Sequence, residues 1–425
     1  MNKKIFIEPV ARVEGHGGIE VLIEKDKVKE IKVDIFEGPR LIEKLVIGKS
    51  PDEAVSICSR ICAICFVSHR LSEIISQEKA MGIKPGRKTQ LLRKLAHYGE
   101  MIESHSLHYY LLALPDYFGY PDAIRMLEKH EEIAGALELK KYGNKIMEIV
   151  AGRRIHGENM RIGGFGKYPD EKELEWIKAK AYELIPVVES GIKLWNKVNV
   201  PDYLEEETIF MSVDSDNEYA FIGDRVKIST GEVFQAEEYS EIIKERVVKH
   251  SFSKRCRYKG KPYSVGALAR IINSGDKLDG LAKDYFHQLY NSRWLKNPLF
   301  NNIAQAIEIL YCLEKIPSLV DEIRKADDKT TGPERKTGSG VGIVEAPRGL
   351  LIHYNKLLNG KVDFADYIIP TTQNLDDMEK YMKVAAENLL KMKEENLELP
   401  LEMIMRAYDP CISCSVHMVR VRRMQ

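Results

Sequence analysis

The chain has 425 residues, of which 44% are hydrophobic and 30% are charged. That length suffices for one large fold, or for two or three domains, with an extensive buried core. Because 64 Lys and Arg residues balance 64 Asp and Glu residues, the net charge gives no reason to expect a nucleic acid or an anionic membrane as partner.

The N-terminal segment predicts neither export nor membrane insertion. The stretch MNKKIFIEPVARVEG reaches Glu8 and Pro9 too early to contain the apolar region of a signal peptide. No later run approaches the roughly 18 uninterrupted apolar residues that a membrane-spanning helix requires. We therefore expect a cytoplasmic protein whose seven cysteines are reduced thiols, which favours metal binding over disulfides.

Two antiparallel strands are the first predicted elements. Hydrophobic residues alternate with polar ones on both sides of a charged turn at residues 25–27, as in a half-buried hairpin. The alternating residues are Ile19, Val21, Ile23, Ile31, Val33 and Ile35. Helical spacing follows in residues 90–114, for which we expect Thr89 as the N-cap and Pro115 as the end.

Other local patterns continue toward the C-terminus. Asp170 and Glu173 have capping-box spacing ahead of an amphipathic helix, and residues 374–393 predict another long helix. Residues 350–370 predict a β-hairpin that turns at Asn359 and Gly360. The glycine-rich residues 336–349, just before this hairpin, are expected to form a loop.

These patterns predict an α+β fold that is mainly helical, with small antiparallel β elements near the N-terminus and before the C-terminal cysteines. We expect a single fold over residues 1–417, because no clean linker divides the chain. Within it, residues 1–36 form the N-terminal β region, residues from about 50 to 330 the helical core, and residues 340–417 an α/β segment that binds a metal.

Two Cys-x-x-Cys pairs predict a metal site: Cys62 with Cys65, and Cys411 with Cys414. Between the pairs lie 345 residues, whereas structural zinc knuckles draw their second pair from about 15–20 residues away. One shared metal would therefore require both ends of the chain to meet in the core. Four thiolates could hold a structural zinc ion, or a softer redox metal with an open position for a substrate. The remaining cysteines, expected as buried small hydrophobes, are Cys58, Cys256 and Cys312.

Five motifs follow one another along the chain. They are RVEGHGG at residues 12–18, RICAIC followed by His69, GRRIHGENMRIGGFG at residues 152–166, EAPRG at residues 345–349 and DPCISCSVH at residues 409–417. In this order they resemble the signature motifs of nickel–iron hydrogenase large subunits, and they span almost the whole chain. The full pattern is most similar to the alpha chain of the cytoplasmic NAD(P)-linked sulfhydrogenases.

The resemblance implies the metal ligands and the reaction. It implies that Cys62, Cys65, Cys411 and Cys414 bind nickel, and that Cys65 and Cys414 also bind an iron carrying one carbon monoxide and two cyanides. The implied activity is the reversible heterolytic cleavage of dihydrogen, with Cys411 as the thiolate that takes the proton. By the same resemblance, His69 lies beside the metal ligands.

Four further residues match positions around that centre. Glu14 matches the carboxylate that receives the proton, although a salt bridge with Arg12, two residues away on a strand, is the alternative. Arg348 resembles an arginine above the iron, where a permanently charged guanidinium stabilises anionic ligands; without its motif it would be typical of a surface loop. Thr371 matches a hydrogen-bond donor to the second cyanide. Asp409 either pairs with Arg348 or forms a turn before the following proline.

Glu43 and His417 match the residues that hold a second, nonredox ion, usually magnesium. A carboxylate suits such a hard cation better than an imidazole does, and by pattern alone the two would be an exposed helix residue and a tail residue. The chain departs from many respiratory relatives at Ser104, where they have an aspartate. The resemblance also implies that a dedicated endopeptidase removes residues 418–425 after nickel insertion; the alternative is a frayed basic tail.

The partners are implied by what the chain lacks. Three cysteines beyond the two pairs are too few for a four-thiolate iron–sulfur cluster, and no Gly-x-Gly-x-x-Gly fingerprint for a nicotinamide is present. The resemblance implies a small subunit with iron–sulfur clusters, together with further subunits whose iron–sulfur clusters and flavin exchange electrons with NAD(P). Alternatives are a deazaflavin- or heterodisulfide-linked hydrogenase, a noncatalytic subunit with a quinone site, or a zinc-stabilised structural subunit. Retention of all four cysteines argues against the quinone-site alternative.

Overall fold

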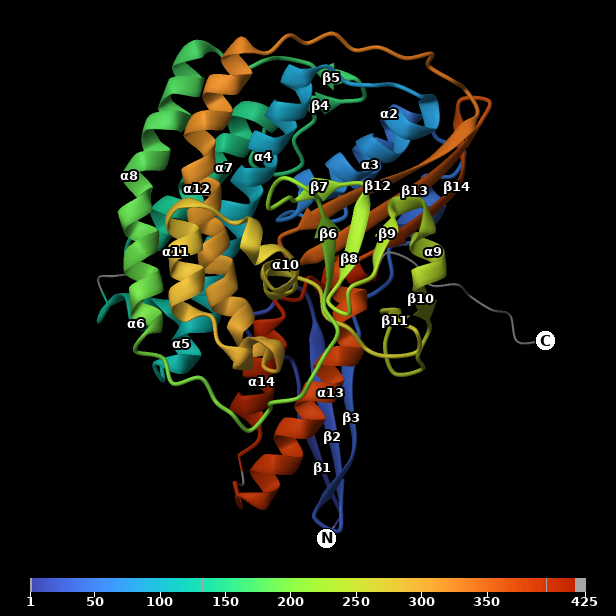
Figure 1. Cartoon of the computed structure of the whole chain (residues 1–425). Coiled ribbons are helices and arrows are strands. Elements are labelled where there is room, and N and C mark those ends of the chain that lie inside the picture. Colours follow the sequence, from blue (N-terminus) through green and yellow to red (C-terminus); the bar gives the residue numbers. More distant parts are fainter. Residues whose placement is uncertain (1, 131–132, 395, 417–425) are drawn as a thin grey trace, which may run out of the picture.

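The computed structural model describes residues 2–130, 133–394 and 396–416. Long helices form one side of the molecule, and antiparallel sheets lie beside them (Figure 1). The α-helices are α1 (Ile42–Leu45), α2 (Pro51–Cys58), α3 (Phe66–Met81), α4 (Arg87–Ser106), α5 (Leu114–Tyr117), α6 (Ala123–Leu127), α7 (Ala136–Ala151), α8 (Glu171–Trp195), α9 (Tyr239–Ile242), α10 (Ala267–Ser274), α11 (Gly280–Leu289), α12 (Asn301–Lys325), α13 (Pro370–Lys391), α14 (Glu398–Ala407) and α15 (Ile412–Ser415).

The strands of the described residues form small antiparallel sheets. In order across each sheet they are β1 (Asn2–Ile7), β2 (Gly17–Glu24) and β3 (Lys27–Ile35); β14 (Lys361–Ile368), β13 (Gly349–Leu358), β12 (Gly338–Ala346) and β7 (Ile222–Gly223); β6 (Met211–Asp214), β8 (Arg225–Ile228) and β9 (Val233–Gln235); β10 (Ile243–Arg246) and β11 (Arg255–Tyr258); and β4 (Met160–Arg161) and β5 (Gly164–Phe165). The predicted α+β class, mainly helical, is confirmed. The prediction did not include the strands of residues 211–258.

The N-terminal sheet confirms the predicted hairpin. β2 pairs with β3 around a turn in which Lys25 and Asp26 both have positive φ. The six alternating residues singled out in the sequence are all buried, and α13 packs against β3 on this sheet (Figure 1). One edge of the sheet is formed by β1, which pairs with β2.

The helix at residues 90–114 differs from its prediction at both ends. Its N-cap is Gly86 rather than Thr89, because Thr89 already lies in the first turn of α4, where its backbone N–H and its hydroxyl donate to Asp328 (3.0 and 2.8 Å). Pro115 does not end the run. A π-helical segment, η1 (Leu107–Ala113), continues α4 into α5, and Pro115 is the second residue of α5 in this continuous helical run.

The glycine-rich segment before the hairpin is a strand, β12, and not the predicted loop. Its alternate glycines face α3: a Cβ on Gly338, Gly340 or Gly342 would lie 2.0–2.2 Å from a backbone carbonyl oxygen of that helix. The hydroxyls of Ser72 and Ser76 instead donate to the carbonyls of Gly342 and Gly340, both at 2.9 Å. The glycines therefore allow a helix to pack directly on a strand, a contact that spacing within the segment does not reveal.

The other predicted elements are present. Asp170 and Glu173 form both bonds of a capping box at the start of α8, and the predicted helix at residues 374–393 is α13, which starts four residues earlier. β13 and β14 form the predicted hairpin, with positive φ at Asn359 and Gly360. Cys58, Cys256 and Cys312 are buried, as expected. Among the described residues, no helix is long and apolar enough to cross a membrane.

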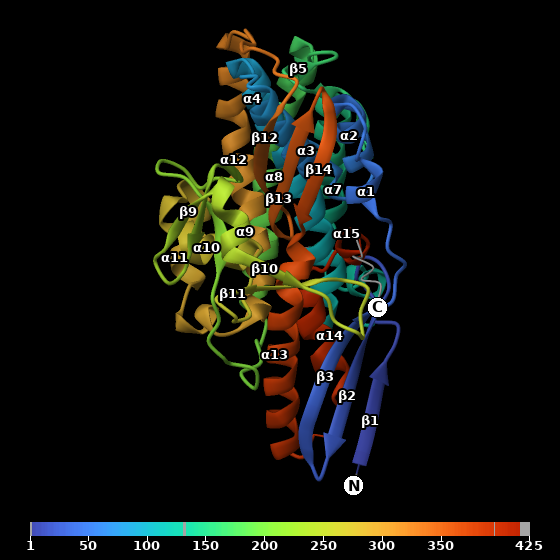
Figure 2. The ribbon, with the colours of Figure 1, turned by 90° about the vertical axis from the view of Figure 1, so that its right-hand side faces the viewer.

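The two ends of the chain meet in the interior. Near the start of the chain, the backbone N–H of Arg40 donates to the carbonyl of Val416 (2.9 Å), and the carbonyl of Glu14 accepts from the N–H of Ile412 (3.0 Å). In Figure 2, α15 accordingly lies close to α1 and to the upper end of the N-terminal sheet. This closure places both cysteine pairs in the same region.

Candidate metal centre

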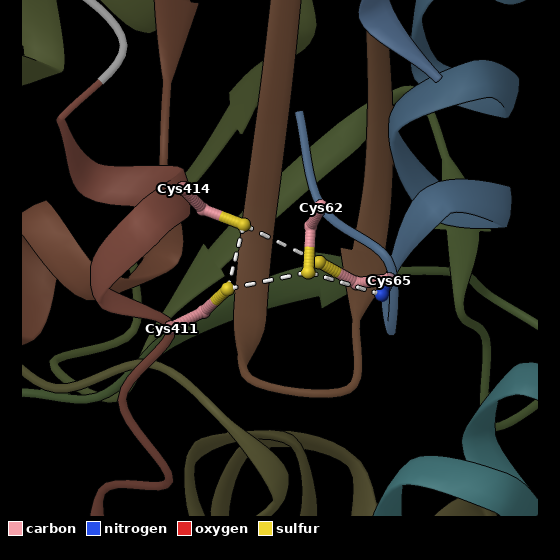
Figure 3. Close-up of side chains that lie close together, drawn as sticks. All are labelled: Cys62, Cys65, Cys411 and Cys414. Carbon is pink, nitrogen blue, oxygen red and sulfur yellow. Dashed lines mark hydrogen bonds between the residues drawn. The ribbon is translucent and has the colours of Figure 1, made fainter. Parts of the chain in front are cut away.

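The two cysteine pairs lie together in the core. Cys62 lies in the turn between α2 and α3, and Cys65 is the N-cap residue of α3; Cys411 is the N-cap residue of α15, which carries Cys414. All four sulfur atoms are within 4.8 Å of one another, and none of the four residues is more than 4% exposed. Figure 3 shows the four side chains pointing toward a common centre.

The sulfur atoms form a compact donor set. Sγ of Cys62 is 3.4 Å from that of Cys411, Cys65 is 3.5 Å from Cys414, and Cys411 is 2.7 Å from Cys414. Burial raises the pKa of the Cys411 and Cys414 thiols, whereas hydrogen bonds from the other three thiols lower the pKa of Cys62. A cation among the four sulfurs would stabilise the thiolate form of each. The chemistry of this donor set therefore fits a thiophilic metal.

The C-terminal pair is fixed through its backbone. The N–H of Cys411 donates to Oγ1 of Thr371 (2.9 Å), in the first turn of α13. Thr371 is 2% exposed, so the structure places this predicted site residue directly against the cysteine loop.

Arg348 lies at the tip of a tight hairpin and not on the surface. Ala346 and Gly349 pair across β12 and β13, so Pro347 and Arg348 form a two-residue turn. The Arg348 side chain is buried, and its Nε donates to Oδ1 of Asp409 (3.1 Å). Burial alone would lower its pKa, but the charges of Asp409 and of the cluster cysteines raise it well above the ordinary value. Its Nη1 is buried without a hydrogen-bond partner among the described residues, which fits a group bound beside the cluster.

Asp409 completes this ion pair. Burial raises the pKa of its carboxyl group, but Arg348 and two nearby histidines more than offset that effect, so the pKa lies below its usual value. Ser104, where an aspartate would occur in many respiratory relatives, is buried in α4, and its Oγ has no hydrogen-bond partner in the described part of the chain. Position 104 therefore supplies no carboxylate to the surroundings of Asp409.

Glu14 contacts the C-terminal cysteine loop. Its carboxylate accepts from the backbone N–H of Ser413 (3.1 Å) and from the hydroxyl of the same residue. Arg12 has left-handed backbone geometry and pairs with Asp116, so the two side chains do not share a strand face as the salt-bridge alternative assumed. Glu14 is half-buried and lies between the cysteine loop and the surface.

Glu43 is buried near a lysine. Its Oε1 accepts from the backbone N–H of Tyr367 (2.8 Å) and lies 3.8 Å from Nζ of Lys254. Burial lowers the pKa of Lys254, but the charges of Glu245 and Glu43 outweigh that effect. The pKa therefore lies above its usual value, and the ammonium stays protonated. His417, the other predicted magnesium ligand, and residues 418–425 lie outside the described residues.

His69 belongs to a buried chain of polar side chains. Its Nδ1 is 3.2 Å from Nε2 of His353, and Nδ1 of His353 is 2.9 Å from Oε2 of Glu73. Hydrogen bonds from His353 and other neighbours outweigh burial, which acts in the opposite direction, and lower the pKa of Glu73. The Glu73 carboxylate therefore orients the His353 ring directly and the His69 ring through His353.

Sequence analysis missed two residues that support the site. Arg40 donates through Nη2 to the carbonyls of Ile61 (2.6 Å) and Ser413, one in each cysteine loop. Glu100 accepts from the backbone N–H groups of Val67 (2.6 Å) and Ser68 (3.0 Å), in the first turn of α3. Neither residue has a local pattern that marks it, because both act on segments distant in sequence.

Comparisons with known proteins agree with this geometry. The chain matches the family model described as nickel-dependent hydrogenase at residues 40–134 and 211–417, and a HoxL-like model at residues 4–37. It is 44% identical to the alpha chain of sulfhydrogenase 1 from Pyrococcus furiosus, over 98% of both chains. It is 29% identical to the beta chain of the NAD-reducing hydrogenase HoxS from Cupriavidus necator, over 98% of this chain and 95% of the other.

Solved structures give the same result for the fold. A crystal structure of an NAD+-reducing [NiFe]-hydrogenase in the H2-reduced state superposes with a TM-score of 0.90 at 28% identity, over 98% of this chain and 99% of that chain. A Ni-Fe-Se hydrogenase from D. vulgaris Hildenborough, at 23% identity and a TM-score of 0.77, shares the fold over 98% of this chain and the whole of the other.

Proposed function

The chain belongs to the nickel-dependent hydrogenase family, and from that membership we propose the roles of its residues. It is the large, catalytic subunit of a nickel–iron hydrogenase, an oxidoreductase that acts on dihydrogen. One observation carries the assignment of the reaction to a site: two Cys-x-x-Cys pairs from opposite ends of the chain converge in the core.

We assign nickel to Cys62, Cys65, Cys411 and Cys414, and iron to Cys65 and Cys414 as well. The bound centre supplies the polarising, redox-active site at which dihydrogen is split heterolytically. The thiol chemistry and the burial of the four side chains support this assignment. Tetrahedral zinc is the noncatalytic alternative, because it accepts the same four thiolates.

We assign to the iron one carbon monoxide and two cyanides, and to Arg348 and Thr371 the contacts with the cyanides. The unpartnered Nη1 of Arg348 is a buried donor that an anionic ligand would satisfy. Oγ1 of Thr371 accepts from Cys411, which leaves its hydroxyl proton available for donation. Asp409 keeps the guanidinium in place through the bond to Nε.

Cys411 holds the proton released from dihydrogen at Sγ, and Glu14 receives it. Glu14 bonds to the loop that Cys411 begins, and it is half-buried. A carboxylate with access to both the interior and the surface suits a group that binds and then releases a proton.

We place a second, nonredox divalent ion, usually magnesium in the resembling family, at Glu43 and His417. A buried carboxylate supports a hard cation, whereas the ammonium of Lys254 near Glu43 opposes a further positive charge there. His69 is assigned a supporting role beside the ligands, oriented through His353.

We propose that electrons leave through a small subunit that carries iron–sulfur clusters. Two relatives are named as alpha or beta chains of larger hydrogenases, and their names motivate a sulfhydrogenase-like cytoplasmic assembly in which iron–sulfur and flavin subunits exchange electrons with NAD(P). A heterodisulfide-linked assembly is the second candidate, because a chain of the F420-non-reducing hydrogenase vhu from Methanocaldococcus jannaschii is 33% identical over 91% of this chain. That name gives no support to the deazaflavin-linked alternative, since F420 is a deazaflavin.

We also propose that residues 1–417 form one folding unit and that an endopeptidase removes residues 418–425. The first part rests on one hydrophobic cluster that contains both Ile7 and Val416. The second rests on the DPCISCSVH motif, which ends at His417.

Metal analysis and intact-mass measurement on the native complex test the proposed function. We expect nickel and iron in this chain, a C-terminus at His417, and dihydrogen-dependent reduction of NADP. Zinc alone, in an active complex that retains residues 418–425, would instead indicate a structural zinc site. Nickel and iron with reduction of another acceptor would leave the hydrogenase assignment intact and change only the partner subunits.

A further inference from the structure

We propose that three buried residues are positioning residues that hold Arg348 against the cysteine cluster. They are Gln305 and Glu308 on helix α12, and Arg270, the ion-pair partner of Glu308, on the neighbouring helix α10. This inference rests on the proposed function, because it concerns how the reaction centre is kept in register. None of the three residues lies in a sequence motif, and each is fully or almost fully buried.

The first support is backbone contact at the hairpin tip. Arg270 donates through Nη1 to the carbonyl of Ala346 (3.1 Å) and through Nη2 to the carbonyl of Pro347 (3.2 Å), the two residues that precede Arg348. Gly349, which follows, has φ +131°, and a Cβ there would lie 2.4 Å from Cγ2 of Val265. The turn that carries Arg348 is therefore packed against the start of α10 and bonded to its side chain.

The second support is the charge balance around Arg270. Its guanidinium donates to Glu308 through Nε and Nη2, both at 2.6 Å, and to Glu345 through Nη1 at 2.9 Å. Glu308 also bonds to His105, at 2.8 Å, and accepts from the Tyr219 hydroxyl. A buried charge persists only where it is paired and hydrogen-bonded, so this network fixes Arg270 in one place and orientation.

The third support is the side-chain path through Gln305. Its Nε2 donates to Oδ2 of Asp409 (3.0 Å), while Oδ1 of Asp409 accepts from Arg348 (3.1 Å). Its Oε1 lies 2.5 Å from Nδ1 of His108, which fixes the orientation of the amide. Gln305 and Glu308 are three residues apart and therefore share a face of α12. Gln305 holds the Arg348 side chain through Asp409, and Glu308 holds the hairpin backbone through Arg270.

The position of Arg348 matters because a buried nitrogen of its guanidinium group is left for the reaction centre. Nε is used by Asp409, whereas Nη1 is buried with no hydrogen-bond partner among the described residues. Gln305 bonds to Asp409 and Arg270 to the hairpin backbone, whereas Glu308 acts through Arg270. They therefore act through Arg348, and displacement of a catalytic group by about 1 Å can lower a rate roughly 100-fold.

The test uses Gln305→Met, which keeps the length of the side chain and removes its hydrogen bonds, in the complete native complex. Asn302→Leu is the matched control: Asn302 is a buried amide on the same helix, but its Nδ2 donates to Tyr117 (2.9 Å), away from Arg348. Dihydrogen oxidation with an artificial viologen acceptor gives kcat and KM for each variant, and nickel content and thermal midpoint are measured in parallel.

We expect Gln305→Met to lower kcat about 10- to 100-fold at unchanged nickel content, with KM for dihydrogen within about twofold of the wild-type value, and Asn302→Leu to lower kcat less than about twofold. In an Arg348→Lys background, Gln305→Met should lower kcat by no more than about a further twofold, because its effect passes through Arg348. Arg270→Lys, which keeps the charge but not the forked contacts, should show the same dependence on Arg348.

Equal losses for Gln305→Met and Asn302→Leu, or losses that multiply fully with Arg348→Lys, would overturn the inference. The two failures are separable: if the wild-type complex contains no nickel or does not oxidise dihydrogen, the proposed function is wrong, whereas an active wild-type enzyme with uncoupled variants rejects only the positioning role. If Gln305→Met does not fold, the Arg270→Lys cycle decides.

Discussion

Residues that differ in burial have different roles around the cysteine cluster. Arg348 and Asp409 are both buried and paired, so they form a fixed ion pair beside the cysteine cluster. Glu14, in contrast, is half-buried and bonded to a loop. Intermediate exposure suits a group that passes protons to solvent during turnover, because a carboxylate in contact with water can release its proton directly.

Glu14→Gln tests the proton route. The amide retains the size of the carboxylate but cannot take up a proton, so we expect dihydrogen oxidation to fall about 100-fold or more while nickel and iron contents stay unchanged. Glu37→Gln is the control, since Glu37 accepts from the backbone of His16 near the same loop (3.2 Å). Activity within about threefold of wild type in Glu14→Gln would rule out this route.

Glu100 makes stability depend on pH. Burial raises its pKa from 4.5 to about 8, although hydrogen bonds from Ser68 and Val67 act in the opposite direction. Between these two values the folded state binds more protons than the unfolded state, so this group makes the free energy of unfolding fall as pH rises from about 4.5 to 8.

Glu100→Gln should remove that dependence. The thermal midpoint of the variant complex, relative to wild type, should rise by a few degrees as the pH is raised from 5 to 9. Glu128→Gln, at an exposed position at the end of α6, serves as control and should not reproduce this rise. A pH-independent difference for Glu100→Gln would show that the carboxyl group does not titrate in this range.

At the scale of elements, glycine spacing decides how close a helix and a strand approach. The three alternate glycines of β12 face the backbone of α3, the helix that Cys65 caps. Since β12 also leads into the turn that carries Arg348, one contact sets the distance between a cysteine loop and the arginine opposite it.

Gly340→Ala tests this packing. The new methyl group would lie 2.2 Å from the carbonyl oxygen of Ser76 and 2.6 Å from Cβ of Lys79, so the helix has to move. We expect the free energy of unfolding to fall by about 1–3 kcal/mol, measured by thermal or denaturant unfolding. Gly38→Ala is the control, because a Cβ at Gly38 meets nothing within 4 Å; equal stability of the two variants would contradict the packing argument.

At the scale of the whole molecule, the site exists only when both ends of the chain have met. The hydrophobic cluster that surrounds the four cysteines also contains residues of α1, α2, β13 and β14. A bound metal would therefore add a link between the two cysteine segments, about 350 residues apart. Backbone bonds such as that from Ile412 to Glu14 already join the C-terminal segment to the N-terminal one.

Arg40→Met removes a polar part of that link. The side chain donates to both cysteine loops, so its loss should speed nickel release to a chelator about tenfold or more, measured by metal content over time in the native complex. Arg60→Met is the control, because Arg60 donates to Ser56 and Glu158 instead. Equal release rates would show that Arg40 does not hold the loops together.

Local patterns predicted much of the fold because they reflect the conformational preferences of the segment that carries them. Alternation and turn residues gave the hairpin at residues 17–35, the capping box gave the start of α8, and Asn359 with Gly360 gave the turn between β13 and β14. The errors have a common cause, which is that a residue type typical of a loop or a cap is used for a tertiary contact instead. The glycines of β12 allow contact with α3, and Thr89 bonds to Asp328.

The sequence by itself determined the chemistry of the centre: the two Cys-x-x-Cys pairs, their motifs and the residues of the proposed proton route are recognisable without coordinates. Only the tertiary structure decided which residues support them. Arg40, Glu100, Arg270 and Gln305 act through hydrogen bonds to residues 21 to 373 positions away. Such contacts leave no periodicity in the sequence, because they are fixed by how the chain closes and not by the conformation of the segment that carries them.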